Sequence, residues 1–185
     1  MKYIFVIFLF LFSSQSLSKA DDISSFEIEG MSIGDSLLDY LSKSEIKNYE
    51  NDYYIDPEFV AVRIPSAFID NYDLLDVHYK VDSNYIIHSI DGIIKEENIT
   101  KCKNIINKID VEFSKLFKNS RKGEWNKELM FSKDGYLHGY YYLLDSGDWS
   151  EVSCYEFKKN LGTNHGRVSV YTKELDEWLK YVKHK

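Results

Sequence analysis

Apolar residues recur at steps of three and four positions in three segments of the chain, and this spacing predicts three amphipathic helices. The longest stripe, within residues 98–118, consists of Ile99, Cys102, Ile106, Ile109, Phe113 and Leu116. An earlier stripe consists of Ile33, Leu37, Leu38 and Leu41, with Ser32 or Asp35 as the capping residue. The last stripe consists of Leu175, Trp178, Leu179 and Val182, with Thr172 as its cap.

Six further segments are rich in β-branched and aromatic residues and are bounded by turn residues, which predicts strands. In chain order they read FVAVRIP, YDLLDVHYKV, YIIHSIDGIIK, YLHGYYYLL, WSEVSCYEF and RVSVYT. The turns DSN and DSGD join two pairs of them as β-hairpins. The stretch NSRKGEWNKELMFSKDG is expected to be a polar connection, in which residues 129–131 offer one more edge strand.

The predicted element order is therefore α-βββ-α-βββ-α, which indicates an α+β fold. Hairpins make the sheet antiparallel, with about six strands. Because each helix carries a single apolar stripe, we expect the helices to pack on one face of the sheet. A degenerate duplication of an αβββ unit would give the same order, so such a duplication is a further hypothesis.

The N-terminal segment has the features of a cleaved signal peptide. Tyr3 to Phe12 is an apolar run of ten residues, and as a helix it would rise about 15 Å, roughly half of a hydrocarbon core. The small residues Ser18 and Ala20 fit signal peptidase, so we expect cleavage after residue 20. Residues 21–185 then form a single exported domain without a membrane span, in the periplasm or secreted. An uncleaved N-terminal anchor is the alternative.

The net charge of the chain limits the classes of molecule that it can be expected to bind. The chain of 185 residues carries 23 basic and 30 acidic residues, a net charge of −7. Removal of residues 1–20 takes away Lys2 and Lys19, which leaves a net charge of −9. Nucleic acids and anionic membrane surfaces require clustered positive charge, so both are disfavoured as partners.

The two cysteines lie in the exported part of the chain, 52 residues apart. Exported proteins keep disulfides, so Cys102 and Cys154 are expected to pair. Since Cys102 lies on the helical stripe and Cys154 on a strand, the bond would fasten that helix to the sheet. Two buried thiols or a redox-active pair are the alternatives, although the wide spacing is unlike that of a Cys-x-x-Cys motif.

Histidines and carboxylates provide the candidate chemistry. If Asp82 to Asn84 form a three-residue loop, His78 lies opposite His88, and the two imidazoles could hold a metal ion with a carboxylate. The alternative is a cross-strand pair on a solvated face. The segment DSGDWSE places Asp145, Asp148 and Glu151 around a hairpin turn, where we expect solvated carboxylates.

Aromatic residues provide a candidate binding surface. Trp149, Tyr155 and Phe157 alternate along one strand and therefore share one of its faces. An exposed platform of such rings would favour a protein or a glycan as partner. The alternative is that a second layer covers them.

The phrases EGMSIGDSLLDYL and SCYEF, together with the signal region and the cysteine in the long helix, resemble uncharacterised small exported proteins of bacteria with AT-rich genomes. That group has no assigned activity. The helix-then-strand units also resemble, in architecture alone, envelope binding modules such as outer-membrane assembly lipoproteins and secreted enzyme inhibitors. The lipid-bearing cysteine of the lipoproteins is missing here.

The sequence favours a non-enzymatic binding or interaction module of the cell envelope. Its partner would be an envelope protein or a glycan, and no cofactor is expected. The alternative function is that of a small secreted metal-dependent hydrolase built on His78 and His88. A thiol-redox function of Cys102 and Cys154 is a third hypothesis.

Overall fold

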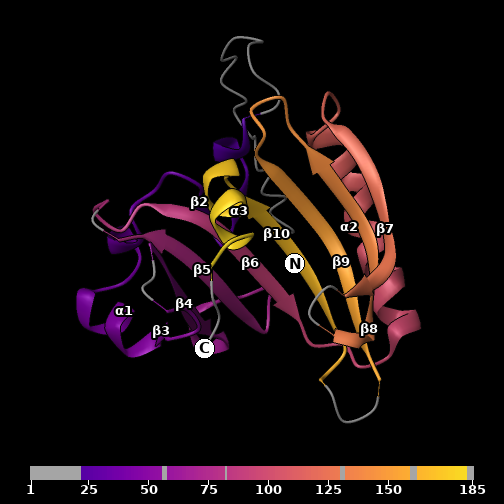
Figure 1. The fold of residues 1–185 in the computed structure, drawn as a ribbon, viewed down its shortest axis with the longest axis horizontal. Coiled ribbons are helices and arrows are strands. Elements are labelled where there is room, and N and C mark those ends of the chain that lie inside the picture. Colours follow the sequence, from indigo (N-terminus) through magenta and orange to yellow (C-terminus); the bar gives the residue numbers. More distant parts are fainter. Residues whose placement is uncertain (1–21, 56–57, 82, 130–131, 159–161, 183–185) are drawn as a thin grey trace, which may run out of the picture.

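The computed structural model describes residues 22–55, 58–81, 83–129, 132–158 and 162–182. The predicted signal peptide, residues 1–20, lies outside the described residues. Within them, eight strands form one antiparallel sheet in the order β3-β4-β5-β6-β10-β9-β8-β7 (Figure 1). In that order the strands are Glu50–Asn51, Phe59–Pro65, Leu74–Lys80, Ile87–Ile94, His165–Tyr171, Trp149–Phe157, Ser132–Leu143 and Arg121–Leu129.

Three α-helices lie in the described part of the chain, so the prediction of an α+β fold is confirmed. They are α1 (Lys43–Tyr49), α2 (Ile99–Leu116) and α3 (Lys173–Leu179). A small sheet of β1 (Glu27–Ile28) and β2 (Met31–Ser32) precedes them. Short 3₁₀ turns are η1 (Ile23–Ser25), η2 (Leu37–Asp39) and η3 (Ser66–Phe68).

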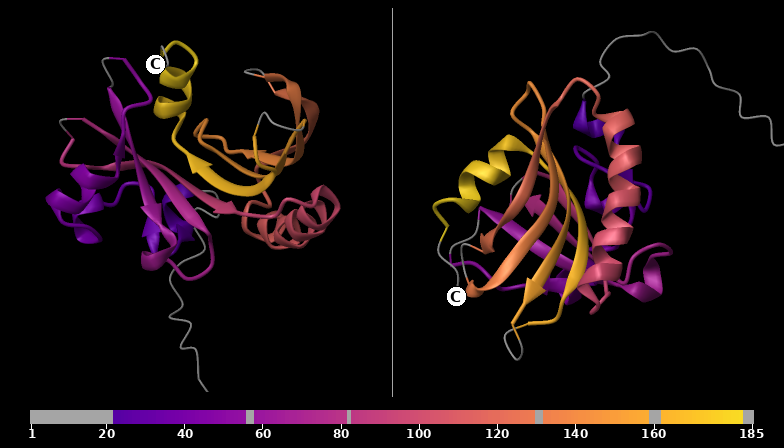
Figure 2. Two further views of the ribbon diagram at one scale, coloured as in Figure 1. Left: turned by 90° about the horizontal axis from the view of Figure 1, so that it is seen from below. Right: turned by 90° about the vertical axis from the view of Figure 1, so that its right-hand side faces the viewer.

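The eight-stranded sheet is bent, so that β7 and β8 curl toward α3 (Figure 2, left). We name the face on which α3 lies the concave face and the other the convex face. Two three-stranded meanders, β4-β5-β6 and β8-β9-β10, meet through the antiparallel pair β6–β10, and each carries one more strand at its outer edge, β3 and β7. Four strands therefore follow each of the first two helices, α1 and α2, where the sequence predicted three. The duplication itself stays a prediction.

Helix α2 lies on the convex face, as its apolar stripe predicts. Cys102, Ile106 and Phe113 are buried and belong to the same core cluster as Val152 and Val168 of the sheet. Leu116, the last residue of the predicted stripe, is 52% exposed, and Phe117 is buried in its place. The reason is that the helix ends at this point, where Phe117 leaves helical geometry with a ψ of 40°.

The predicted disulfide is present. Cys102 of α2 and Cys154 of β9 are bonded, with their Cα atoms 6.1 Å apart. Both residues are almost fully buried on the convex face. A Cβ atom added at Gly166 of β10 would lie 3.4 Å from the sulfur of Cys102, so a residue without a side chain lets the bond lie close to the sheet.

The expectation that all helices share one face is wrong for α3. Leu175 of this helix packs with Phe59 and Tyr171 in a second core cluster. Tyr171 follows Val170 along β10, and Val170 belongs to the convex core, so the two side chains point to opposite faces. Helices α2 and α3 therefore lie on opposite faces of the sheet (Figure 2).

The first predicted helix does not form over residues 33–41. Gly34 has a φ of +93°, which a helix does not permit. Ser36 caps the 3₁₀ turn η2 instead, and α1 begins after Ser42. Ser42 and Glu45 form a capping box, which satisfies backbone donors at the start of α1.

The predicted polar connection is in fact mostly strand β7, nine residues long. It pairs with β8 from Arg121 opposite Leu143 to Leu129 opposite Ser132. As an edge strand it draws its stability from backbone hydrogen bonds to β8, and its charged residues are typical of protected edges. Apolar alternation is therefore weak in β7, and this is why the sequence pattern missed it.

Candidate functional site

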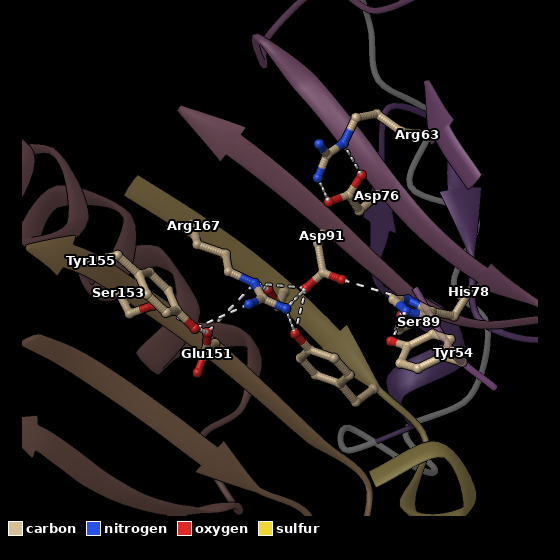
Figure 3. A network of polar contacts seen from close by, with 12 residues as sticks. Tyr54, Arg63, Asp76, His78, Ser89, Asp91, Glu151, Ser153, Tyr155 and Arg167 are labelled. Atoms are coloured by element: carbon tan, nitrogen blue, oxygen red, sulfur yellow. Dashed lines mark hydrogen bonds and ion pairs between the residues drawn. The ribbon is translucent and has the colours of Figure 1, made fainter. Parts of the chain in front are cut away.

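The concave face carries a row of charged side chains, two of them buried carboxylates and one a half-buried arginine. Ser169 of β10 lies opposite Asp91 of β6 on one side and opposite Glu151 of β9 on the other. Arg167 lies two residues before Ser169 and therefore on the same face. Its guanidinium lies between the two carboxylates (Figure 3). Asp91 and Glu151 are 1% and 3% exposed, so the expectation that Glu151 is a solvated turn residue is wrong.

Most polar groups of these side chains are hydrogen-bonded to one another. Nε and Nη2 of Arg167 donate to Oδ1 of Asp91 at 2.9 and 2.6 Å. Nη1 of Arg167 donates to the hydroxyl of Tyr155 at 3.0 Å, and Tyr155 donates to Glu151 at 3.2 Å. Nε of Arg167 lies 3.7 Å from the carboxylate of Glu151. Tyr171 donates to Asp91. We name these residues, Asp91, Glu151, Tyr155, Arg167 and Tyr171, the polar network.

Burial and charge act against each other in the polar network. Burial raises the pKa of the Glu151 carboxyl, and the positive charge of Arg167 opposes this rise. Burial alone would lower the pKa of the Arg167 guanidinium, but the charges of Asp91 and Glu151 raise it well above its ordinary value. Arg167 is therefore a permanent cation. Its charge is what makes two buried carboxylates tolerable in the centre of one sheet face.

His78 extends the polar network toward β5. Its Nδ1 lies 2.8 Å from the hydroxyl of Ser89 and its Nε2 lies 3.0 Å from the hydroxyl of Tyr54. Oδ2 of Asp91 is farther away, at 4.0 Å. Burial lowers the pKa of His78, against the opposing effect of Asp91. The ring is therefore neutral at pH 7 and acts as a hydrogen-bonding link between strands.

The predicted cross-strand pair of His78 and His88 is wrong. His78 lies opposite Ser89, and the register shifts at the next pair, Tyr79 and Ile87. His88 is thus the extra residue of a β-bulge. Its Nδ1 lies 3.0 Å from the hydroxyl of Thr172, at the start of α3. Among the described residues no group of three or more His, Cys, Asp or Glu side chains could hold a metal ion.

The low pKa of His78 predicts acid sensitivity. A histidine whose pKa is lower in the folded than in the unfolded state binds its proton less tightly when folded. Stability is then lost as the pH falls through the unfolded value of about 6.5. We expect urea unfolding at pH 7 and pH 5 to show a smaller loss of stability for His78→Gln than for the unchanged protein. An equal loss in both proteins would contradict this.

The predicted aromatic surface lies on the concave face but is not an exposed platform. Tyr155 is 7% exposed, and it packs with Leu129 and Leu137. Phe157 is half-buried against the same cluster. Trp149 is half-buried and stacks on Tyr171, with ring centroids 4.5 Å apart and planes at 13°.

Trp149 instead forms part of the wall of a cavity. This cavity, which we name the aromatic cavity, has a volume of about 460 Å³ and lies between α3 and the curled strands β7 to β9. Its lining consists of Trp125, Lys127, Tyr141, Leu143, Trp149, Asp176, Leu179 and Lys180. Figure 2 (left) shows the arrangement of the elements that carry this lining: α3 stands on the concave face opposite the strands that curl toward it.

The shape of the sheet wall depends on one glycine. The ring of Tyr141 lies across Gly123, where an added Cβ atom would come within 2.1 Å of the ring. With this room, Tyr141 packs against Trp125 at 4.4 Å between ring centroids. The pair forms one continuous aromatic wall.

A second cavity, of about 290 Å³, lies on the other side of β7 and β8, against α2. Its lining is more polar and includes Lys103, Asn107, Glu124, Asn126 and His138. His138 is held by Glu156, with Nε2 and the carboxylate 2.9 Å apart. The larger aromatic cavity offers more apolar surface to a ligand and is the stronger candidate.

Sequence reasoning found Trp149, but it missed most of the site. Trp125 and Lys127 lie in the segment that was expected to be a connection. The polar network did leave a signal, since Asp91 interrupts an apolar strand and Arg167 and Glu151 also lie inside predicted strands. A charge inside a buried strand indicates a partner on a neighbouring strand.

Comparisons with protein-family models, with curated proteins and with solved structures give no match for this chain. Within the described residues no helix has both the length and the apolar character needed to cross a membrane.

Proposed function

We propose that the protein is a non-enzymatic binding protein that takes a small ligand with an apolar body into the aromatic cavity. The cavity is the observation that carries the proposal. Its volume of about 460 Å³ lies within the range of about 300–1,000 Å³ that is usual for small-molecule sites. Three aromatic residues and two leucines supply its apolar walls.

The polar network supports binding more than catalysis. Its ionised groups are bonded to one another rather than directed at the aromatic cavity. Trp149 connects the two, because its ring stacks on Tyr171 and Tyr171 donates a hydrogen bond to Asp91. The network thus fixes one wall of the cavity in place, and a rigid site loses less entropy when a ligand binds.

The proposal includes export to the periplasm or beyond, as the predicted signal peptide implies. The disulfide of Cys102 and Cys154 supports it, because such bonds persist in oxidising compartments. A concave site of about 460 Å³ favours a small molecule over the envelope protein or glycan that the sequence suggested.

Titration with N-phenyl-1-naphthylamine, an uncharged fluorescent probe of apolar sites, tests the proposal. We expect a saturable rise in its fluorescence with the unchanged protein. In Leu143→Trp the larger side chain fills the aromatic cavity, and we expect the affinity to fall at least about tenfold.

Val111→Trp is the matched control. It adds the same side chain at a position of α2 that is 54% exposed and far from the cavity lining, so binding should be retained. Circular dichroism spectra of both variants establish that they are folded. The absence of saturable binding to the unchanged protein, or equal binding by a folded Leu143→Trp variant, would refute the proposal.

A further inference from the structure

The charged residues at the aromatic cavity differ in sign from the protein as a whole. The chain has a net charge of −7, whereas the cavity lining contains two lysines, Lys127 and Lys180, and one acidic residue, Asp176. The charged part of the lining is therefore net positive. A ligand with an anionic group would meet an attractive local charge here, in contrast to the negative net charge of the chain.

Asp176 of α3 forms an ion pair with Lys180, the residue that directly follows the helix. Nζ of Lys180 lies 2.7 Å from the carboxylate of Asp176, and the two side chains are 58% and 30% exposed. The hydrogen bond to Asp176 raises the pKa of Lys180. The pair is neutral as a unit, and Lys180 keeps donor protons free for a second acceptor, because an ammonium group has three.

Lys127 differs from Lys180, since no carboxylate among the described residues lies within 4.0 Å of its ammonium group. Its Nζ instead lies over the ring of Trp125, 3.7 Å from the centroid. An exposed cation–π contact of this kind is weak, whereas a hydrogen bond between two charged groups is stronger. An anion at the cavity could therefore take Lys127 as a partner without breaking an existing ion pair.

We infer that the ligand of the aromatic cavity is an amphipathic monocarboxylate, whose apolar body lies between the aromatic wall and Leu179 and whose carboxylate binds Lys127 and Lys180. This inference rests on the proposed function. The volume of about 460 Å³ is in the range usual for sites that bind small organic molecules. A medium-chain fatty acid and an aromatic acid share this chemistry.

Displacement of bound N-phenyl-1-naphthylamine by ligands of equal chain length tests the inference. Decanoate, decanol and decylamine share a ten-carbon chain and carry a negative, an uncharged and a positive head group. We expect decanoate to displace the probe at a concentration about tenfold lower than decanol does, and decylamine to be the weakest of the three. A parallel pair, 1-naphthoate and 1-naphthalenemethanol, shows whether the site prefers an aromatic or an aliphatic acid as its ligand.

Lysine variants show whether the predicted head-group contacts are responsible. Lys127→Gln should weaken decanoate about five- to tenfold and leave decanol unchanged, and Lys180→Gln should act in the same direction. Lys108→Gln is the control, because this lysine is exposed on α2 and belongs to the convex side.

The outcomes separate the inference from the proposed function. Equal displacement by decanoate and decanol, a preference for decylamine, or an unchanged decanoate affinity in Lys127→Gln would overturn the inference while probe binding still supported the proposed function. A protein that binds neither the probe nor decanoate would overturn both.

Discussion

Replacement of Arg167 by methionine is expected to lower the free energy of unfolding by about 3 kcal/mol. Methionine keeps much of the apolar stem of the arginine but removes its charge. Asp91 and Glu151, which are 1% and 3% exposed, would then stay buried without their cation. The side chain of Arg167 is itself 24% exposed, so water relieves part of the cost, and we expect the lower end of the range for broken buried pairs. Urea unfolding measures the change.

Arg63→Met is the matched control on the same face. Arg63 also forms a two-pronged pair, with Asp76, through hydrogen bonds of 2.7 Å from Nε and Nη2. Figure 3 shows the two arginine–aspartate pairs side by side. Since the side chain of Arg63 is 47% exposed, its loss should cost less than about 1 kcal/mol. If Arg63→Met and Arg167→Met lose the same free energy of unfolding, the greater cost expected at the more buried arginine is refuted.

A triple variant separates loss of charge balance from loss of packing. In Arg167→Met combined with Asp91→Asn and Glu151→Gln no charge of the polar network is left unpaired. We expect this variant to be more stable than Arg167→Met alone, because uncharged amides cost less to bury than carboxylates. If the triple variant is less stable than the single variant, packing and hydrogen bonds outweigh charge in this network.

Replacement of both Cys102 and Cys154 by alanine is expected to lower the free energy of unfolding by about 4 kcal/mol, because the unfolded chain regains the freedom of a 52-residue loop. For a domain of this size the melting temperature should fall by about 8–16 °C. The bond joins α2 to β9 within the convex core, so part of the loss is also in packing. Differential scanning calorimetry measures both quantities.

Reduction of the unchanged protein provides the control for the disulfide. A reducing agent at a concentration that opens the bond should lower the melting temperature of the unchanged protein but not that of the Cys102→Ala, Cys154→Ala variant. An unchanged melting temperature after complete reduction would contradict a stabilising disulfide. Easy reduction by weak reductants would instead support the redox hypothesis.

The sequence predicted the helices and strands whose buried faces impose a regular spacing of apolar residues. Helix α2 and the meander strands have one or both faces covered, so apolar residues recur at the period of the backbone. The disulfide was also predictable, because Cys102 lies on the buried stripe of a helix and Cys154 lies inside a buried strand. The helix and the strands are each predicted from their own residues. The disulfide joins a helix and a strand that can each be predicted separately.

The missed elements depend on geometry that the apolar pattern does not record. Strand β7 is held at the edge by backbone pairing, so its own side chains need little apolar alternation. The first helix failed because Gly34 adopts a positive φ. The bulge at His88 shifted the register of β5 and β6 by one position, and one position was enough to separate His78 from His88.

The sequence by itself predicted the α+β class, the antiparallel hairpins and the long helix, because each follows from periodicity and turn residues. It also predicted the bond of that helix to the sheet, from the two cysteines of an exported chain and the place of Cys102 on the helical stripe. The tertiary structure alone decided which face α3 covers and how β7 and β8 bend toward it. It also brought Asp91, Glu151 and Arg167 together from three strands. The aromatic cavity arises from that bend and from the position of α3. Such features depend on how distant segments meet in space, and hydrophobic periodicity within one segment carries no information about that.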